Sequence, residues 1–106
     1  MKTYKIQGYG EIFKIKLTAH SYANNGRLAV QSFIVPDGEP FATITVNIDY
    51  PLSGSKETTA FIDTNNLDAF RIERFLQENK IATPTGKYGQ SGFCTYPEYR
   101  FDLSKF

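Results

Sequence analysis

The last quarter of the chain reads Thr85-Gly86-Lys87-Tyr88-Gly89-Gln90-Ser91-Gly92-Phe93-Cys94-Thr95-Tyr96-Pro97-Glu98-Tyr99-Arg100-Phe101. It holds three glycines, one cysteine and five aromatic residues. Glycine is favoured where the backbone needs a positive φ or where another segment comes close. Aromatic side chains bury much apolar surface and are frequent at interface hot spots. The stretch therefore predicts either the seam that closes a small sheet or a recognition surface.

Upstream of this stretch, alternating apolar and polar residues predict β-strands. The pattern is clearest in 13–19, where one face carries Phe13, Ile15, Leu17 and Ala19 and the other carries Lys14, Lys16 and Thr18. Further strands are expected over 4–7, 28–35, 41–48, 58–62 and 98–103. Asn24-Asn25-Gly26 is typical of a tight hairpin turn. In 41–48, Ile44, Val46 and Ile48 share one face, and Thr43, Thr45 and Asn47 lie on the other.

One helix is expected from about Asn66 to Asn79. Asn65 as N-cap with Asp68 three residues later resembles a capping box, and Pro84 is expected to end the segment. At 100° per residue, one face carries Ala69, Ile72, Phe75 and Leu76, and Arg71, Arg74, Gln77 and Glu78 lie away from it. Leu67 and Phe70 fall outside this apolar stripe.

The connections between successive strands are too short for parallel crossovers, so the strands should be antiparallel. We therefore predict a single α+β domain over residues 1–106, with an antiparallel sheet of five to seven strands and one amphipathic helix packed on it. A chain of this length buries a sizeable core without metal or disulfide bonds.

Composition narrows the classes of partner. The chain has twelve Lys and Arg residues and eleven Asp and Glu residues. This near balance argues against a strongly basic nucleic-acid binder and against an acidic DNA mimic. The single cysteine, Cys94, excludes an internal disulfide and fits a reducing compartment. No apolar run resembles a signal peptide or a membrane span, so a cytoplasmic protein is expected.

The sequence offers little for catalysis or metal binding. A cysteine enzyme needs a histidine beside its thiol, and His20 is the one histidine available to Cys94. A buried structural cysteine is the favoured interpretation. One Cys and one His cannot complete a structural zinc site, and capping explains the oxygen side chains of 63–66. The glycines of 86–92 lack the context of a phosphate-binding loop, and a turn with a flexible tip is expected there instead. No enzyme activity, metal or cofactor is expected.

Two surfaces are candidates for binding. Lys14 and Lys16, with Lys2 and Lys5 nearby, could meet phosphates, and Tyr4, Tyr9 or Tyr22 could stack on bases. A solvated sheet face explains the same lysines. The preferred surface combines the outer helix face with the glycine-rich segment, because an exposed aromatic flanked by arginines has hot-spot composition. Its predicted partner-binding residues are Phe70, Arg71, Arg74, Lys87 and Tyr88.

Three segments together resemble the domain-of-unknown-function family 4313, small bacterial proteins often encoded on phages and conjugative elements. They are Asp37 to Asn47, Phe61 to Asn66, and Pro84-Thr85-Gly86 running through Ser91-Gly92-Phe93-Cys94-Thr95-Tyr96-Pro97 to Phe101. The resemblance supplies no catalytic residues. It implies a mobile-element context, in which small proteins often counter host defence.

Together these points favour a non-enzymatic binding protein, with an anti-CRISPR inhibitor that binds a CRISPR effector protein as the expectation drawn from the resemblance. The alternatives are a small nucleic-acid-binding accessory protein and a cysteine-dependent enzyme.

Overall fold

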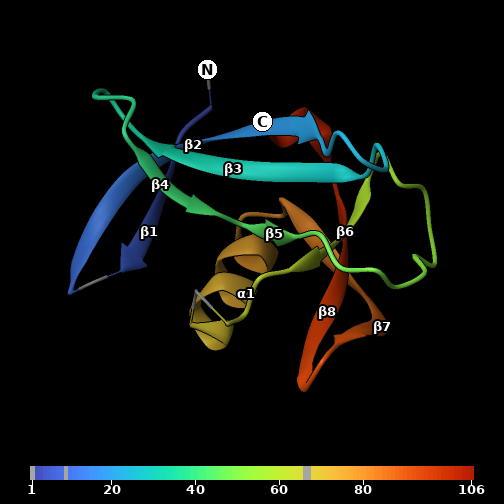
Figure 1. The fold of residues 1–106 in the computed structure, drawn as a ribbon. Helices are drawn as coiled ribbons and strands as arrows, with labels where there is room; N and C mark the ends of the chain where they lie inside the picture. The colour runs from blue at the N-terminus through green and yellow to red at the C-terminus, as the bar shows by residue number, and fades with distance from the viewer. Residues whose placement is uncertain (1, 9, 66–67) are drawn as a thin grey trace.

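In the computed structural model, which describes residues 2–8, 10–65 and 68–106, the first part of the chain forms a four-stranded antiparallel sheet, here sheet A (Figure 1). Its strands β1 (Tyr4–Gly8), β2 (Glu11–Ser21), β3 (Leu28–Ile34) and β4 (Pro40–Thr43) pair in sequence order. The hairpin expected at Asn24-Asn25-Gly26 joins β2 to β3, and Gly26 has a φ of 71°. Ile15 and Leu17 of β2 are buried as predicted, whereas Ala19 near its end is exposed.

The rest of the chain forms a second antiparallel sheet, sheet B, with strand order β5-β6-β8-β7. Its members are β5 (Thr45–Val46), β6 (Thr59–Ile62), β7 (Ala82–Ser91) and β8 (Cys94–Phe101), followed by a 3₁₀ turn, η1 (Leu103–Lys105). The α+β class and the antiparallel pairing are confirmed. The expected single sheet of five to seven strands is corrected to eight strands in two sheets.

The predicted strand 41–48 is divided at Ile44, where the chain passes from sheet A to sheet B. Thr43 still pairs with Gln31 of β3, but Thr45 pairs with Ile62 of β6. At the crossing, the Thr45 hydroxyl accepts a 3.0 Å hydrogen bond from the Val30 backbone N–H. Thr45, on the face opposite Ile44, is therefore buried as well, because its side chain replaces a strand carbonyl that the crossing removes.

Helix α1 (Ala69–Glu78) starts later than the sequence suggested. Its N-cap is Asp68, whose carboxylate accepts a hydrogen bond from the Arg71 N–H at 3.2 Å, so the prediction of Asn65 as N-cap is wrong. Asn65 is engaged elsewhere, with β8. The expected first helical residue, Asn66, and the off-stripe Leu67 lie outside the described residues.

The predicted apolar stripe of α1 is confirmed at Ile72, Phe75 and Leu76, which are buried, but Ala69 is exposed.

The helix ends at Asn79 and Lys80, not because of Pro84, which lies inside β7. Lys80 has a φ of 55° and its N–H donates to the Gln77 carbonyl at 3.1 Å. The Ile81 N–H donates to the Leu76 carbonyl at 2.9 Å. This is a Schellman termination with a lysine in the left-handed position that glycine usually occupies.

The stretch 86–92, expected to be a turn with a flexible tip, is largely strand β7, which pairs with β8 on both sides of an irregularity between Pro84 and Tyr88. Its glycines have the two expected roles. Gly86 and Gly92 have positive φ, at the irregularity and at the hairpin turn. A Cβ on Gly89 would lie 2.6 Å from Cε1 of Phe61, so β7 crosses a buried ring at this point.

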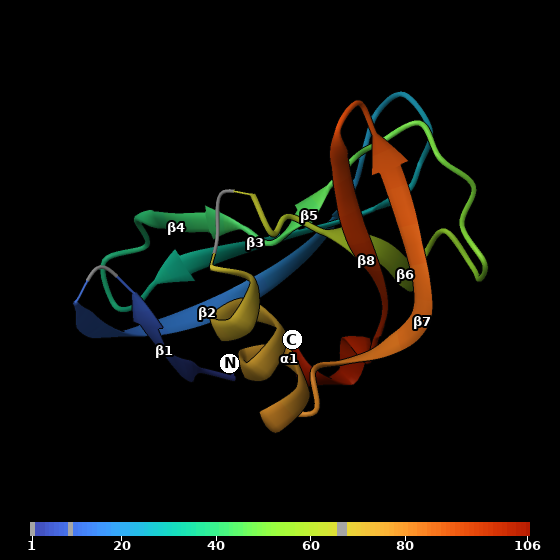
Figure 2. The same cartoon turned by 90° about the horizontal axis from the view of Figure 1, so that it is seen from below.

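The main core lies between α1 and the two sheets (Figure 2). Ile72, Phe75 and Leu76 of the helix pack in one apolar cluster with residues of both sheets, including Ile15 and Tyr99. The Tyr99 hydroxyl, from β8, donates to Glu73 at 2.7 Å and accepts from Gln77 at 2.9 Å. Burial, followed by the bond to Glu73, raises the pKa of Tyr99 strongly. The helix is thus fixed to sheet B by polar as well as apolar contacts.

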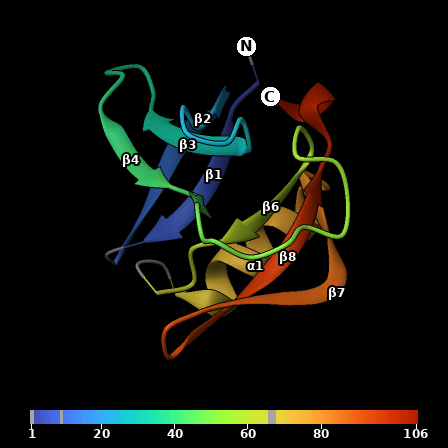
Figure 3. The same cartoon turned by 45° about the vertical axis from the view of Figure 1, so that its right-hand side comes forward.

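A second, smaller apolar cluster lies on the other face of sheet B. Ile48, Phe61 and Tyr96 are buried there together, where the loop of residues 47–58 runs along β6 and β8 (Figure 3). Because this cluster and the main core lie on opposite sides, the central strands of sheet B are covered on both faces.

Glu98 of β8 anchors this covering loop. Its side chain is 1% exposed, and the carboxylate accepts hydrogen bonds from the Ser53 N–H at 2.8 Å, the Ser53 hydroxyl, and the Thr85 hydroxyl at 2.6 Å. Burial alone would raise the pKa of Glu98, but these donors outweigh it and hold the pKa below its usual value. In the alternation of 98–103, Glu98 shares a polar face with Arg100 and Asp102, so the sequence alone does not indicate a buried acceptor.

Candidate functional site

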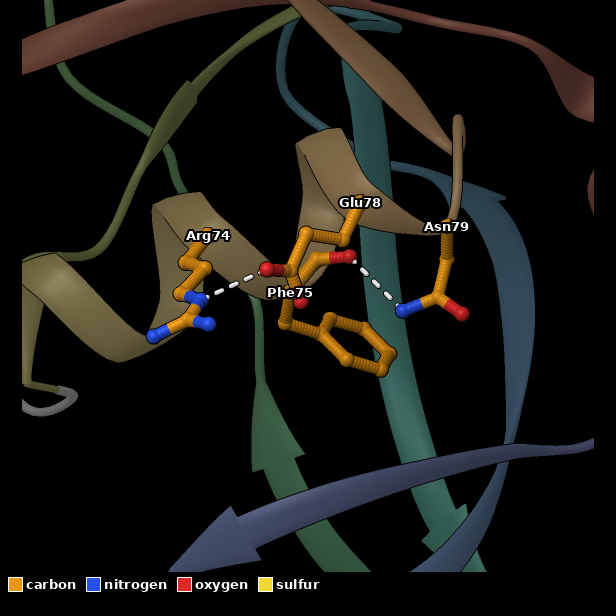
Figure 4. Close-up of polar contacts among 4 residues, drawn as sticks. All are labelled: Arg74, Phe75, Glu78 and Asn79. Atoms are coloured by element: carbon orange, nitrogen blue, oxygen red, sulfur yellow. Dashed lines mark hydrogen bonds and ion pairs between the residues drawn. The ribbon is translucent and has the colours of Figure 1, made fainter.

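The outer face of α1 presents an aromatic and cationic ridge made of Phe70 and Arg74. Phe70 is 71% exposed, and the Arg74 guanidinium carbon lies 5.8 Å from the centroid of its ring. Arg74 Nε also donates to Glu78 Oε1 at 2.6 Å, an i,i+4 ion pair that raises the pKa of Arg74 (Figure 4). Arg74 is therefore held by a ring on one side and a carboxylate on the other, which reduces its freedom before any partner binds.

A groove of about 550 Å³ runs beside the ridge, between α1 and β1. It is lined by Lys5, Ile6, Gln7, Asp68, Phe70, Arg71, Arg74, Phe75, Glu78 and Asn79. Phe75 and Ile6 are almost fully buried, and the Phe75 ring makes an edge contact with Tyr4 of β1 at 6.1 Å between centroids. Figure 4 shows this ring projecting from the helix toward β1. The base of the groove is apolar and its rim is charged.

A shallower hollow of about 350 Å³ lies along the same helix and shares Phe70, Arg74 and Glu78 with the groove. Its other lining residues are Glu73 and Gln77. Phe70 and Arg74 therefore stand between two depressions, as a projecting anchor does at an interface.

Of the five predicted partner-binding residues, the structure brings three together. Phe70, Arg71 and Arg74 line the α1–β1 groove. Lys87 and Tyr88 are exposed, with Tyr88 at 60%, but they belong to β7 and line neither depression. The prediction that they extend the helix surface rested on a loop that is in fact a strand.

The sequence pattern did not indicate that β1 contributes to the helix surface, because it grouped Lys5 with Lys14 and Lys16 as a separate candidate. Lys5, Ile6 and Gln7 line the groove opposite the helix, although they are separated from α1 by more than sixty residues of sequence. A local pattern can show that 4–7 form a strand, but not that this strand lies at a sheet edge beside a helix. The β1–β2 pairing also places Lys5 directly opposite Lys14.

Cys94 and His20 have separate partners. The Asn65 side-chain N–H₂ group lies 3.0 Å from Cys94 Sγ and 3.1 Å from the Tyr96 hydroxyl. Burial, then the neighbouring Cys94, raises the pKa of Tyr96. His20 Nε2 lies 3.1 Å from Thr18 Oγ1 on β2. Within the described part of the chain, no hydrogen bond joins the cysteine to the histidine, and no three His, Cys, Asp or Glu side chains group as metal ligands would.

The model of the family described as Domain of unknown function (DUF4313) matches residues 16–106. The chain belongs to this family. The DUF4313 match includes α1, all of sheet B and most of sheet A, and it begins within β2, so β1 precedes it. No match was found among curated proteins or among solved structures. Among the described residues, neither helical segment has the length and apolar content needed to cross a membrane.

Proposed function

We propose that this DUF4313 protein is a non-enzymatic binding module that engages a protein partner through the Phe70–Arg74 ridge and the adjoining groove. The observation that carries the proposal is the state of Phe70. A phenylalanine that is 71% exposed leaves a large apolar surface in water, and an arginine already placed over its ring supports it. Aromatic and arginine residues dominate interface hot spots, where truncation typically costs about 2 kcal/mol or more.

The class of partner we propose is a CRISPR effector protein, as the family resemblance implies. A binding module acts as an inhibitor by covering a surface that the effector needs, and this requires no catalytic group in the inhibitor. Phage plaque formation on a CRISPR-immune bacterial strain measures that activity directly. Expression of the protein should restore plaques if the targeted effector is its partner.

The ridge is tested by capture. The protein is immobilised, and proteins retained from a bacterial lysate are identified by mass spectrometry and then purified for affinity measurement. The double variant Phe70→Ala with Arg74→Glu should lose at least tenfold in affinity for the purified partner. The matched control is Ile12→Ala with Arg100→Glu, which removes an apolar side chain that is 69% exposed and reverses an exposed arginine elsewhere. Equal binding by the ridge variant and the control would place the interface on another face.

A further inference from the structure

The α1–β1 groove exposes a free strand edge. Strand β1 is the outermost strand of sheet A and pairs with β2 alone. Three consecutive residues, Lys5, Ile6 and Gln7, line the groove. Successive side chains of a strand point to opposite faces of the sheet. Because three consecutive residues all border this groove, the groove runs along the backbone edge of β1. Within the described residues, the β1 backbone has no hydrogen-bond partner outside β2. Its outer N–H and C=O groups are therefore available to a further strand along this edge.

The charged residues around the groove leave an unbalanced positive charge. Asp68 is committed to the helix N-cap and Glu78 to Arg74. Among the described residues, neither Lys5 nor Arg71 forms an ion pair. In addition, Lys5 lies directly opposite Lys14 across the β1–β2 ladder, a like-charge pair that destabilises a sheet. An acidic group beside Lys5 would relieve this repulsion.

From these observations we propose that the groove binds an extended acidic segment of a partner protein, which adds to sheet A as a fifth strand along β1. This strand-addition proposal rests on the proposed binding function and defines the chemistry of the partner segment. Main-chain hydrogen bonds to a free edge supply affinity in such complexes, and alternate side chains supply specificity. The side chains beside Lys5 and Gln7 on the outer face would be acidic. Those beside Ile6 would be apolar, because they face Phe75 and the exposed ring of Phe70.

The same features disfavour other occupants. A second copy of the chain paired edge to edge would bring the Lys5 residues of two β1 strands close together, and β1 carries no acidic residue to offset them. A nucleic acid would satisfy the cations, but its phosphates cannot donate to the strand carbonyls that lie along the same edge. A polypeptide strand has both donors and acceptors at the required spacing.

The test begins with a phage library of random heptapeptides selected on the full-length protein. We expect the selected peptides to alternate Asp or Glu with Val, Ile or Phe. A synthetic peptide of the selected sequence, labelled with fluorescein, should lose at least tenfold in affinity by anisotropy when Lys5→Glu is combined with Arg71→Glu. Both residues are exposed, so the variant should fold. The control, Lys56→Glu with Arg100→Glu, makes the same charge change at exposed sites outside the groove and should bind within about twofold of the parent.

Hydrogen exchange locates the bound peptide. Its binding should slow exchange of β1 amides that face the groove, while amides of β4, the opposite edge of sheet A, stay unchanged. Three results would each overturn the proposal: failure to select acidic alternating peptides, unchanged affinity in the Lys5 and Arg71 variant, or protection of amides away from β1. A dimer detected by sedimentation equilibrium, with the β1 edge buried in it, would overturn it as well. If partner capture still depends on Phe70 and Arg74 in any of these cases, the binding function stands and only strand addition is rejected.

Discussion

At the scale of single residues, Lys80 is the one non-glycine residue with a positive φ in the described part of the chain. Its φ of 55° lies in the left-handed region, which costs a non-glycine residue about 1 kcal/mol or more. Glycine avoids this cost but loses more entropy on folding. We therefore expect Lys80→Gly to raise the free energy of unfolding by up to about 1 kcal/mol in urea titration. Lys80→Ala is the control, since it removes the same charge and keeps the strain of the left-handed backbone. An equal gain in unfolding free energy in both variants would assign the effect to the lost charge.

Glu98 makes stability depend on pH. Its folded-state pKa is lowered, so its contribution is complete above the unfolded-state pKa and is lost as pH falls through the folded-state value. We expect Glu98→Gln to cost about 2 to 3 kcal/mol at pH 7, because hydrogen bonds to a charged acceptor are lost in a buried site. The difference in unfolding free energy between parent and variant should narrow below about pH 4.5, because the unfolded-state carboxylate then begins to bind a proton that the folded state still resists.

Urea titrations of both proteins from pH 7 to pH 3 measure this difference. The exposed Glu57 provides the control, because Glu57→Gln should change stability by no more than about 0.5 kcal/mol at any pH. The difference in unfolding free energy between parent and Glu98→Gln could instead stay constant from pH 7 to pH 3. That result would show that the Ser53 and Thr85 donors do not stabilise the charge of the carboxylate.

At the scale of elements, α1 offers two phenylalanines with opposite environments. Phe75 is 5% exposed within the main core and Phe70 is 71% exposed. We expect Phe75→Ala to cost about 3 to 5 kcal/mol and Phe70→Ala to be nearly neutral in denaturant titration. Because both substitutions are Phe to Ala in one helix, the difference between their losses of unfolding free energy measures the effect of burial. Similar losses in both would mean that Phe70 also supports the fold, which would weaken its assignment to binding.

The helix and several strands could be predicted because their residues repeat with a local period. The buried faces of β2 and α1 follow from Ile15, Leu17, Ile72, Phe75 and Leu76 alone. The exposure of Phe70 follows from the same period. The N-cap was misplaced because Asn65 and Asp68 are both good capping residues, and a contact of Asn65 with β8 decides between them.

The division into two sheets could not be predicted, because alternation continues through Ile44 while the pairing partner changes. At the crossing, the Thr45 hydroxyl meets the Val30 N–H, a contact between residues 15 positions apart in the sequence. The groove was missed for the same reason. Phe70, Arg71 and Arg74 were identified from the helix, but Lys5, Ile6 and Gln7 join them only through the tertiary fold.

At the scale of the whole molecule, the strand order β5-β6-β8-β7 has a kinetic consequence. Sheet A grows by hairpins between consecutive strands, but β6 pairs with β8, and residues 63–93 must first be closed into a loop. Closing a loop of that length costs about 3 kcal/mol of chain entropy. Local hairpins form in microseconds, so sheet A should be structured in the transition state and sheet B should be completed afterwards. In stopped-flow chevrons, Val30→Ala should mainly slow folding and Phe101→Leu should mainly speed unfolding. The reverse pattern would mean that the long-range β6–β8 closure nucleates the fold.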